Sequence, residues 1–285
     1  MKKNHWNRTG TAPAVFLLLL CALLSCQKEN DHADPPADPP DLPAQGPVSM
    51  VLTAVTRSIN DKIGGYYFAL PSNYSQTTQT YPLLVYMHGA GQFGNGTNDL
   101  PLLLKDGVAK VINDKKFPGS FRVSNQTFSF IVLMPQAESF PGIVDINDCI
   151  ELAKKSWRID TRRIYLSGLS AGSMVSCDFA ADNASKIAAL VPMAGVSSDY
   201  AYTNKCQKMA SGNLPVWVFH SEDDPQVSVS TARGFVAKIA SLHPSITPKL
   251  TVWPDGGHDA WTRAVDPAYK ENGMNIYEWM LQYHR

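Results

Sequence analysis

The chain has 285 residues, of which 44% are hydrophobic and 18% are charged. This composition excludes disorder along the whole chain and is enough for one large domain or two small ones. Lys and Arg total 25, as do Asp and Glu, so the formal net charge of zero gives no electrostatic reason to expect a nucleic-acid partner. The five cysteines form no C-x-x-C pair and none has zinc-ligand spacing to a histidine, so neither a disulfide scaffold nor a structural zinc site is expected.

An export signal is predicted at the start of the chain. A positively charged segment, MKKNHWNR, is followed by an apolar run from Ala14 to Leu24 that is too short to span a bilayer. The run ends in Leu-Leu-Ser-Cys at Cys26, which resembles the lipobox of bacterial lipoproteins, where the cysteine carries the lipid. We therefore expect residues 1–25 to be a signal peptide and Cys26 to anchor the chain to a membrane; ordinary cleavage beside an incidental cysteine is the alternative.

A tether rich in proline and aspartate is predicted to follow the anchor. Residues 26–47 show no periodic apolar pattern, so we expect an extended, solvated spacer. The polar and acidic residues directly behind Cys26, QKEND, resemble the signal with which some Gram-negative bacteria send lipoproteins to the outer surface. The expected location is therefore the outer membrane or cell surface of a Gram-negative bacterium.

Residues 48–285 are predicted to form a single α/β domain. Short apolar runs rich in β-branched and aromatic residues alternate with helical stretches, which is typical of βα units around a mostly parallel sheet with helices on both faces. The predicted strands, about eight in number, are Val51–Ile59, Tyr66–Leu70, Leu83–Met87, Phe130–Met134, Ile164–Ser167, Ala189–Met193, Val216–His220 and Leu250–Trp253. The predicted helices are Val144–Trp157, Ala171–Ala181, Ser230–Ser241 and Asn275–Gln282.

The sequence Gly168-Leu169-Ser170-Ala171-Gly172 carries the first catalytic signal. It lies between a predicted strand and a predicted helix, which is the setting of a G-x-S-x-G nucleophile elbow. In such an elbow the serine occupies a strained turn that leaves little room for side chains two residues away, and glycines meet that demand. Ser170 is therefore the candidate nucleophile. The backbone N–H of Ala171, at the start of the helix, is a candidate donor to an oxyanion.

A serine hydroxyl needs a general base, and His258 is the candidate. It lies in the glycine-rich loop DGGHDAW after the last predicted strand, from which its side chain can reach back over the edge of the sheet. The base in turn needs a carboxylate to orient it, and Glu222, Asp223 and Asp224 follow the preceding strand. The chain order of serine, aspartate and histidine is the order found in α/β-hydrolases.

From about Tyr66 onward, the chain resembles esterases of the α/β-hydrolase fold. The resemblance is closest to the carboxylesterase and feruloyl or acetylxylan esterase group, which includes polyhydroxybutyrate depolymerase-like and "predicted peptidase" proteins. It rests on the stretches PLLVYMHGAGQFG, RIYLSGLSAGSM, PVWVFHSEDDPQVSV and DGGHDAW. The group's acid loop, H-G-x-x-D-x-x-V, aligns with His220, Asp224 and Val227 and implies that Asp224 is the acid of the triad. Because Ser221 replaces the glycine of that pattern, Asp223 remains the alternative.

The resemblance also implies a second oxyanion donor. The sequence HGAG at 88–91 resembles the HG-x-G loop of the group, in which the N–H of Ala90 would join that of Ala171. The side chain of His88 is expected to brace this loop. The implied reaction is hydrolysis of a carboxylic ester through an acyl-enzyme on Ser170. It requires neither a metal nor a cofactor.

Loop residues that follow the strand ends are candidates to line a substrate cleft. Gln92 and Trp261 are the expected substrate-binding residues, and Phe93, Gln136 and Phe140 are further candidates, since aromatic rings suit a sugar or a phenolic acyl group. By analogy, the expected partner is a small-molecule or polysaccharide ester of the acetyl or feruloyl type. Two rivals are a serine peptidase of the prolyl-oligopeptidase type and a catalytically silent glycan-binding lipoprotein. The sequence does not fix an oligomeric state.

The predicted domain holds three cysteines, Cys149, Cys177 and Cys206. They allow at most one disulfide, and the pairing stays open. None lies in a turn with a paired base, so none is expected to act as a nucleophile.

Overall fold

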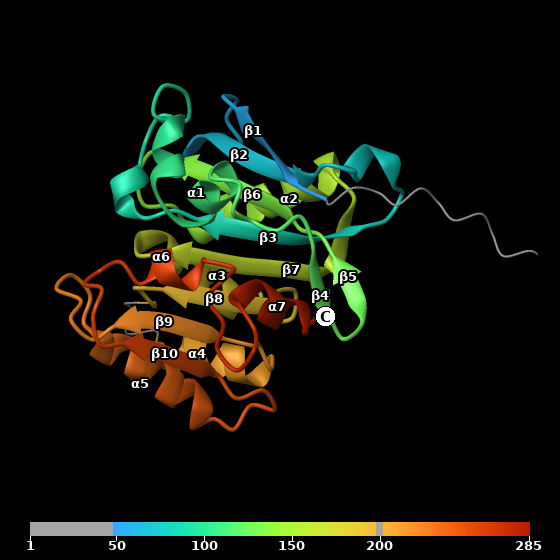
Figure 1. The fold of residues 1–285 in the computed structure, drawn as a ribbon. Coiled ribbons are helices and arrows are strands. Elements are labelled where there is room, and N and C mark those ends of the chain that lie inside the picture. The colour runs from blue at the N-terminus through green and yellow to red at the C-terminus, as the bar shows by residue number, and fades with distance from the viewer. Residues whose placement is uncertain (1–47, 198–201) are drawn as a thin grey trace, which may run out of the picture. The chain divides into compact units, whose positions relative to one another are not determined.

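In the computed structural model, which describes residues 48–197 and 202–285, eight strands form one sheet (Figure 1). The first two strands pair antiparallel with each other, and the second pairs antiparallel with β6. All the other neighbours in the sheet pair parallel. In spatial order the strands are β1 (Met50–Val55), β2 (Ile63–Pro71), β6 (Ile131–Ala137), β3 (Tyr81–Met87), β7 (Ile159–Leu169), β8 (Ala189–Met193), β9 (Trp217–Ser221) and β10 (Lys249–Trp253).

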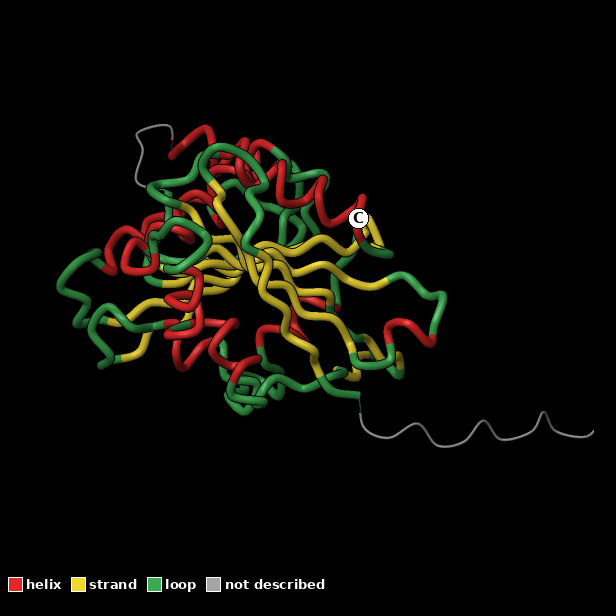
Figure 2. The backbone as a smooth tube through the Cα atoms, turned by 90° about the horizontal axis from the view of Figure 1, so that it is seen from above, coloured by secondary structure: helices red, strands yellow, loops and turns green. Residues whose placement is uncertain are grey.

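Two hydrophobic clusters lie on opposite faces of this sheet. One cluster contains buried residues of α1 (Gly107–Asn113), α6 (Trp261–Ala264) and α7 (Ile276–Leu281). The other contains buried residues of α2 (Ile143–Ser156), α3 (Ala171–Asp182), α4 (Tyr202–Ser211) and α5 (Val229–Ala240). Figure 2 shows the strands running between these two groups of helices. Because both clusters pack against the same sheet, the described residues form a single domain.

The apolar runs of the sequence correspond to the strands of this sheet. Each of the eight predicted strands overlaps one observed strand, and every residue of β3 and of β6 is buried. Burial on both faces is the reason that these strands read as continuous apolar runs. The prediction of a mostly parallel sheet flanked by helices is confirmed.

Several predicted boundaries and omissions are corrected by the structure. The first strand ends at Val55, four residues before the predicted end, and β7 begins at Ile159, five residues before the predicted start. The sequence prediction omitted α1, α4 and α6 and a small antiparallel hairpin of β4 (Phe121–Val123) and β5 (Gln126–Phe128). Apart from the ten-residue α4, these elements are short, and short segments give too few repeats of a periodic pattern to be recognised.

The carboxyl ends of the parallel strands meet at one edge of the sheet, on the left in Figure 1. The turn after β7 and the loops after β3, β9 and β10 therefore converge there, which is where open α/β sheets place their ligand sites. The predicted signal peptide, the tether and Cys26 lie outside the described residues. Among the helices that are described, none is long and apolar enough to cross a membrane.

Candidate active site

Ser170 occupies a strained turn between β7 and α3. Its backbone has φ of 49° and ψ of −118°, in the positive-φ region that residues other than glycine rarely adopt. A hydrogen bond to the neighbouring strand β8 holds the turn, because the N–H of Ser170 donates to the carbonyl of Met193 at 2.9 Å. The sharp reversal turns the side chain of Ser170 into the pocket at the end of the sheet.

The two glycines of the motif are required by close packing of this turn against β3. A Cβ on Gly172 would lie 2.3 Å from the carbonyl oxygen of Met87, and one on Gly168 would lie 2.8 Å from the same oxygen. Neither glycine has a positive φ. The G-x-S-x-G spacing therefore reflects a steric constraint that α3 and β3 impose at the turn.

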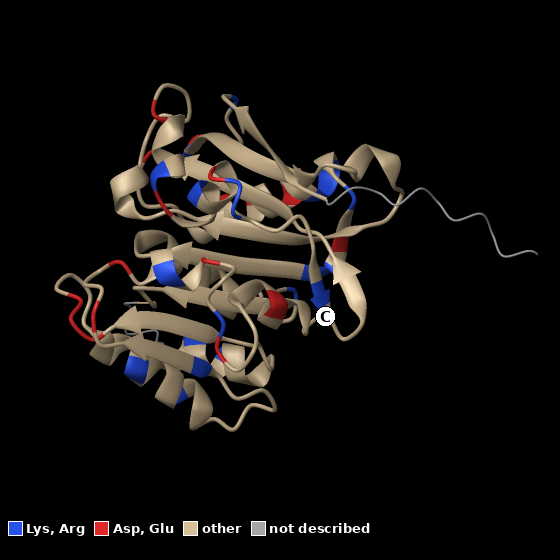
Figure 3. Ribbon diagram, viewed as in Figure 1, with Lys and Arg blue, Asp and Glu red and all other residues tan. Residues whose placement is uncertain are grey.

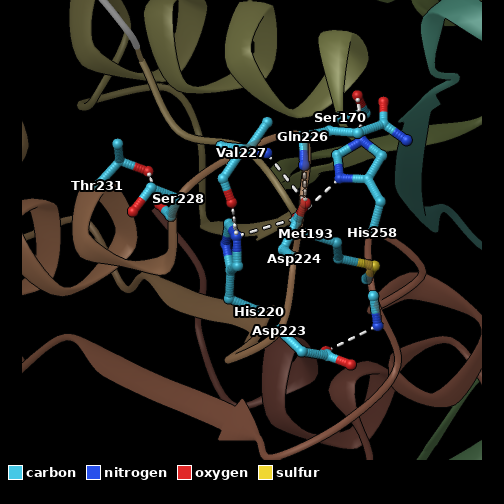
Figure 4. Close-up of polar contacts among 12 residues, drawn as sticks. Ser170, Met193, His220, Asp223, Asp224, Gln226, Val227, Ser228, Thr231 and His258 are labelled. Carbon is cyan, nitrogen blue, oxygen red and sulfur yellow. Dashed lines mark hydrogen bonds and ion pairs between the residues drawn. The ribbon is translucent and has the colours of Figure 1, made fainter.

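His258 bridges Ser170 and Asp224 (Figure 4). Its Nε2 lies 2.9 Å from Ser170 Oγ, and its Nδ1 lies 2.8 Å from Asp224 Oδ2. The loop that presents it contains Gly256 and Gly257, both at positive φ, which lets the chain turn back over the edge of the sheet. Because the carboxylate only accepts, Nδ1 carries the proton and Nε2 is free to accept one from the serine.

Asp224 is a fully buried carboxylate that is held by several donors. Its Oδ1 accepts the backbone N–H groups of Gln226 at 2.8 Å and Val227 at 2.9 Å, and its side chain has no exposed surface. Burial acts to raise the pKa of Asp224, but the hydrogen bonds from His258 and from these two amides outweigh it and leave the pKa below its usual value. The side chain that faces His258 is therefore an ionised carboxylate.

The structure separates the two aspartates that the sequence left as alternatives. Asp224 is the one that contacts His258. Asp223 is exposed and accepts the N–H of Gly257 at 2.8 Å, so it ties the acid loop to the histidine loop. Glu222 is also exposed and pairs with Arg233 on α5.

His220, which the sequence analysis used only to align the acid loop, is part of the same network. It is fully buried at the end of β9, and its Nε2 faces both the carbonyl of Val227 and the carboxylate of Asp224. A histidine four residues before the acid was the only sequence signal of this contact.

The two predicted oxyanion donors belong to different elements at the end of the sheet. Ala171 is the first residue of α3, where a backbone N–H has no partner within the helix. Ala90 begins a short 3-10 turn after β3 and lines the same pocket as Ser170. Ala171 directly follows Ser170 in the chain, and Ala90 shares its pocket, so their role as oxyanion donors stays a prediction.

His88 fixes the loop that carries Ala90. Its Nδ1 lies 2.7 Å from the carbonyl of Gly89, and its Nε2 accepts the N–H of Ala137 on β6 at 2.9 Å. Burial lowers the pKa of His88, so the ring stays neutral in this arrangement. The side chain braces the loop, and His88 is not among the residues that line the pocket at Ser170.

A pocket of about 250 Å³ opens at Ser170. The predicted residue Trp261 lines it, together with Asp106 and Gln226, which the sequence analysis did not single out. Gln92 also borders the pocket, but its side chain is buried and its amide donates to the carbonyls of Leu102 and Leu103. Gln136 was wrongly expected in the cleft: it is fully buried, and its amide binds the backbone of Gln92, Gly96 and Asp99. A larger cavity of about 330 Å³ near Arg57 and Lys155 shares no residue with this pocket.

The cysteines of the domain take no part in this site. Cys149, Cys177 and Cys206 are free and buried. Among the described residues no group of three or more His, Cys, Asp or Glu side chains is placed to hold a metal ion.

Comparison with known proteins places the fold. No protein-family model matches the chain. A 91-residue segment is 32% identical to a bifunctional acetylxylan esterase/xylanase from Neocallimastix patriciarum, and it spans 32% of this chain and 13% of that protein. A thermostable esterase superposes with a TM-score of 0.57 at 20% identity over 83% of this chain and 64% of its own. S-formylglutathione hydrolase from Staphylococcus aureus gives 0.58 at 14% identity over 83% and 98%.

The chain has the α/β-hydrolase fold. The feruloyl esterase module of Clostridium thermocellum, solved with sinapinate, superposes on it with a TM-score of 0.53 at 13% identity over 74% of this chain and 82% of that one. In the α/β-hydrolase fold, a serine on a strand-to-helix elbow is followed in the chain by an acid and then a histidine. Ser170, Asp224 and His258 occur in that order and meet at one edge of the sheet.

Proposed function

We propose that this chain is a carboxylic ester hydrolase that works through an acyl-enzyme on Ser170. The observation that carries the proposal is the unbroken hydrogen-bonded chain from Ser170 Oγ through His258 to the buried carboxylate of Asp224. A serine hydroxyl is a weak nucleophile unless a base accepts its proton, and this arrangement supplies the base and the group that orients it.

The first half of the reaction follows from the positions of these groups. His258 Nε2 accepts the proton of Ser170 Oγ as that oxygen attacks the ester carbonyl, and Asp224 stabilises the imidazolium that forms. The N–H groups of Ala90 and Ala171 donate to the oxyanion of the tetrahedral intermediate. In such sites one donor contributes roughly a hundredfold or more in rate. His258 then gives its proton to the leaving alcohol, and the acyl group stays on Ser170.

The second half repeats these steps with water. His258 deprotonates a water molecule that attacks the acyl-enzyme, the same two N–H groups hold the oxyanion, and the acid leaves as Ser170 recovers its proton. Every proton transfer in the two halves has its donor and its acceptor among Ser170, His258, water and the substrate.

The substrate is proposed to be an ester of a polysaccharide or of an aromatic acid, of the acetyl or feruloyl type. The partial match to an acetylxylan esterase/xylanase and the fold shared with a feruloyl esterase module support this choice. A small pocket beside the indole of Trp261 suits a ring-shaped group next to the ester.

The location is proposed to be the outer membrane or cell surface, through a lipid on Cys26. The charged start, the apolar run and the Leu-Leu-Ser-Cys sequence support this assignment. Expression of the full chain in a Gram-negative host tests it. The wild-type chain should fractionate with membranes, and Cys26→Ala should be released from them; equal distribution of both would contradict the anchor.

The rate of ester hydrolysis by the Val48–Arg285 fragment tests the activity itself. This fragment contains the whole sheet and both hydrophobic clusters. It should hydrolyse a short-chain aryl acetate, and Ser170→Ala should fall to the background rate. If the folded fragment is no faster than Ser170→Ala, the ester hydrolase proposal fails. If it is active, acetylated xylan, methyl ferulate and a peptide panel then separate the substrate classes.

A further inference from the structure

Asp106 is a carboxylate in the wall of the Ser170 pocket that the proposed mechanism does not use. It stands at the N-cap of α1, where an aspartate normally accepts a backbone N–H of the first turn. Here its side chain makes no such capping bond. Helix capping, the usual reason for an aspartate at an N-cap, therefore does not explain Asp106.

The carboxylate of Asp106 turns instead toward Trp261. Its Oδ1 lies 3.4 Å from the indole Nε1 of Trp261, across 155 residues of sequence. The ring of Trp261 in turn meets the ring of His258 edge-on, with ring centres 5.3 Å apart. Asp106 is thus fixed on the same wall as the general base, within the cavity that the reacting ester must enter.

The second oxygen of Asp106 remains available for a ligand. Within residues 48–197 and 202–285, no hydrogen bond to Asp106 Oδ2 is formed, and no Lys or Arg side chain lines the pocket. A carboxylate accepts hydrogen bonds and donates none, so its complement is a donor such as a hydroxyl group.

The surrounding charge makes an anionic ligand a poor fit. Acidic residues gather on the loops after β9 and β10 at this edge, as the red segments in Figure 3 show. Glu222 and Asp255 there are paired with Arg233 and Arg263. Asp223 and Asp259 have no Lys or Arg partner among the described residues, and together with Asp106 they would repel a carboxylate or a phosphate on the substrate. A neutral group with a hydroxyl can donate a hydrogen bond to the free oxygen of Asp106. Because it carries no negative charge, the acidic residues nearby do not repel it.

We propose that Asp106 selects esters that carry a neutral hydroxylated group, whose hydroxyl donates to its carboxylate beside Trp261. The inference rests on the proposed ester hydrolase activity and deepens it. The hydroxyl can belong to a sugar on the alcohol side of the ester or to a phenol on the acyl side, because the pocket adjoins Ser170 and both parts of an ester approach it.

Matched substrate pairs test this proposal on the Val48–Arg285 fragment. One pair compares monoacetylated xylobiose with cyclohexyl acetate, and the other compares methyl 4-hydroxycinnamate with methyl cinnamate. Asp106→Ala should lower kcat/KM by roughly tenfold or more for the hydroxylated member of at least one pair. It should leave the partner without the hydroxyl within roughly twofold. The pair that responds identifies the side of the ester.

Two further variants separate the possible causes of a loss. Asp106→Asn keeps one acceptor oxygen, so it should lose less than Asp106→Ala. Asp114→Ala, at the other end of α1 and paired with Lys110, is the matched control and should not change either pair. Thermal unfolding of each variant checks that the domain still folds. If Asp106→Ala does not fold, the comparison of substrate pairs is made with Asp106→Asn.

Several results would overturn the proposal. An equal loss on both members of a pair would mean that Asp106 acts only by holding Trp261. No loss on either member would mean that the carboxylate does not meet the substrate. An Asp106→Asn variant as impaired as Asp106→Ala, with a preference for cationic esters, would indicate recognition of a positive charge. Each of these leaves wild-type ester hydrolysis intact, whereas a wild type that hydrolyses no ester would refute the proposed function as well.

Discussion

His220 Nε2 lies 3.2 Å from Asp224 Oδ2 and 2.9 Å from the carbonyl oxygen of Val227. The carbonyl can only accept, so this nitrogen carries a proton and shares it with the carboxylate. Asp224 therefore faces His220 as well as His258 and two backbone amides (Figure 4), and its own side chain has no exposed surface. An ionised carboxylate that is this deeply buried is stable only with such a set of donors.

Loss of the His220 donor should impair catalysis through Asp224. A hydrogen bond to a charged group contributes roughly 1.5–3 kcal/mol, so His220→Ala should lower kcat/KM for an aryl acetate by roughly tenfold to a hundredfold. His220→Gln, which keeps an N–H at a similar reach, should recover part of that loss. With one donor fewer, the pKa of Asp224 should rise, and the acid limb of the pH–rate profile should begin at higher pH.

The neighbouring residue provides a control for this experiment. Ser221 Oγ is buried and has no hydrogen-bond partner in the structure, so Ser221→Ala removes no interaction. It should keep the wild-type rate and pH profile. A His220→Ala variant whose acid limb stays in place would show that His220 supports only the packing of the loop.

The two adjacent aspartates should differ sharply when each is changed to asparagine. Asp224→Asn removes the charge that orients His258, and the corresponding change in a Ser–His–Asp triad costs roughly ten-thousandfold in kcat. Asp223→Asn keeps an acceptor for the N–H of Gly257 and should change kcat by less than roughly threefold. Steady-state rates on an aryl acetate decide between them. Comparable losses in both variants would contradict the assignment of the acid.

The elbow glycines should be intolerant of a single methyl group. Gly172→Ala would place a Cβ within 2.4 Å of the carbonyl oxygens of both Met87 and His88. Such overpacking costs about 1–3 kcal/mol, and displacement of the turn should also reduce activity. Gly91→Ala is the control, since a Cβ there meets nothing within 4 Å. Urea unfolding measures the stability of the two variants. Equal midpoints for Gly172→Ala and Gly91→Ala would refute the steric argument.

The sequence predicted the sheet and the three residues that meet at its edge because both have local signatures. Strands buried on two faces, such as β3 and β6, are continuous apolar runs that need no knowledge of their neighbours. Ser170 and His258 lie in glycine-rich turns next to strand ends, and chain order limited the acid to a short loop.

The contacts that the sequence did not reveal depend on distant elements meeting in space. Asp106 is separated from Trp261 by 155 residues, and its position in the pocket follows from how α1 packs on the sheet. Gln136 was expected in the cleft because it follows the predicted strand Phe130–Met134. It lies inside β6 instead, and its side chain turns inward to bind the backbone of the loop after β3. The hydrophobic pattern of a strand predicts which side chains share a face of the sheet. It does not predict which distant group each polar side chain contacts.

His88 should make the stability of the domain depend on pH. Burial lowers its pKa in the folded protein below the usual value of 6.5. Below its usual pKa, His88 is protonated in the unfolded chain but stays neutral in the folded protein. The contribution of neutral His88 to the free energy of unfolding is therefore fully present above about pH 6.5 and is lost as the pH falls further. Urea unfolding between pH 7.5 and pH 5 should show a steeper decline for wild type than for His88→Gln. Parallel pH dependences would show that His88 does not carry this effect.

The three thiols of the domain should be unreactive until the protein unfolds. Burial raises the pKa of Cys206 to about 11 and raises the pKa of Cys149 and Cys177 further, so little thiolate forms at neutral pH. All three are free, so a folded Val48–Arg285 fragment should react slowly with a thiol reagent at pH 8, and all three should react at once in denaturant without a reducing agent. A denatured titre of one thiol would reveal a disulfide and contradict the structure. Rapid reaction of the native fragment would instead mean that the core around α3 and α4 opens easily, because Cys177 and Cys206 lie on these two helices.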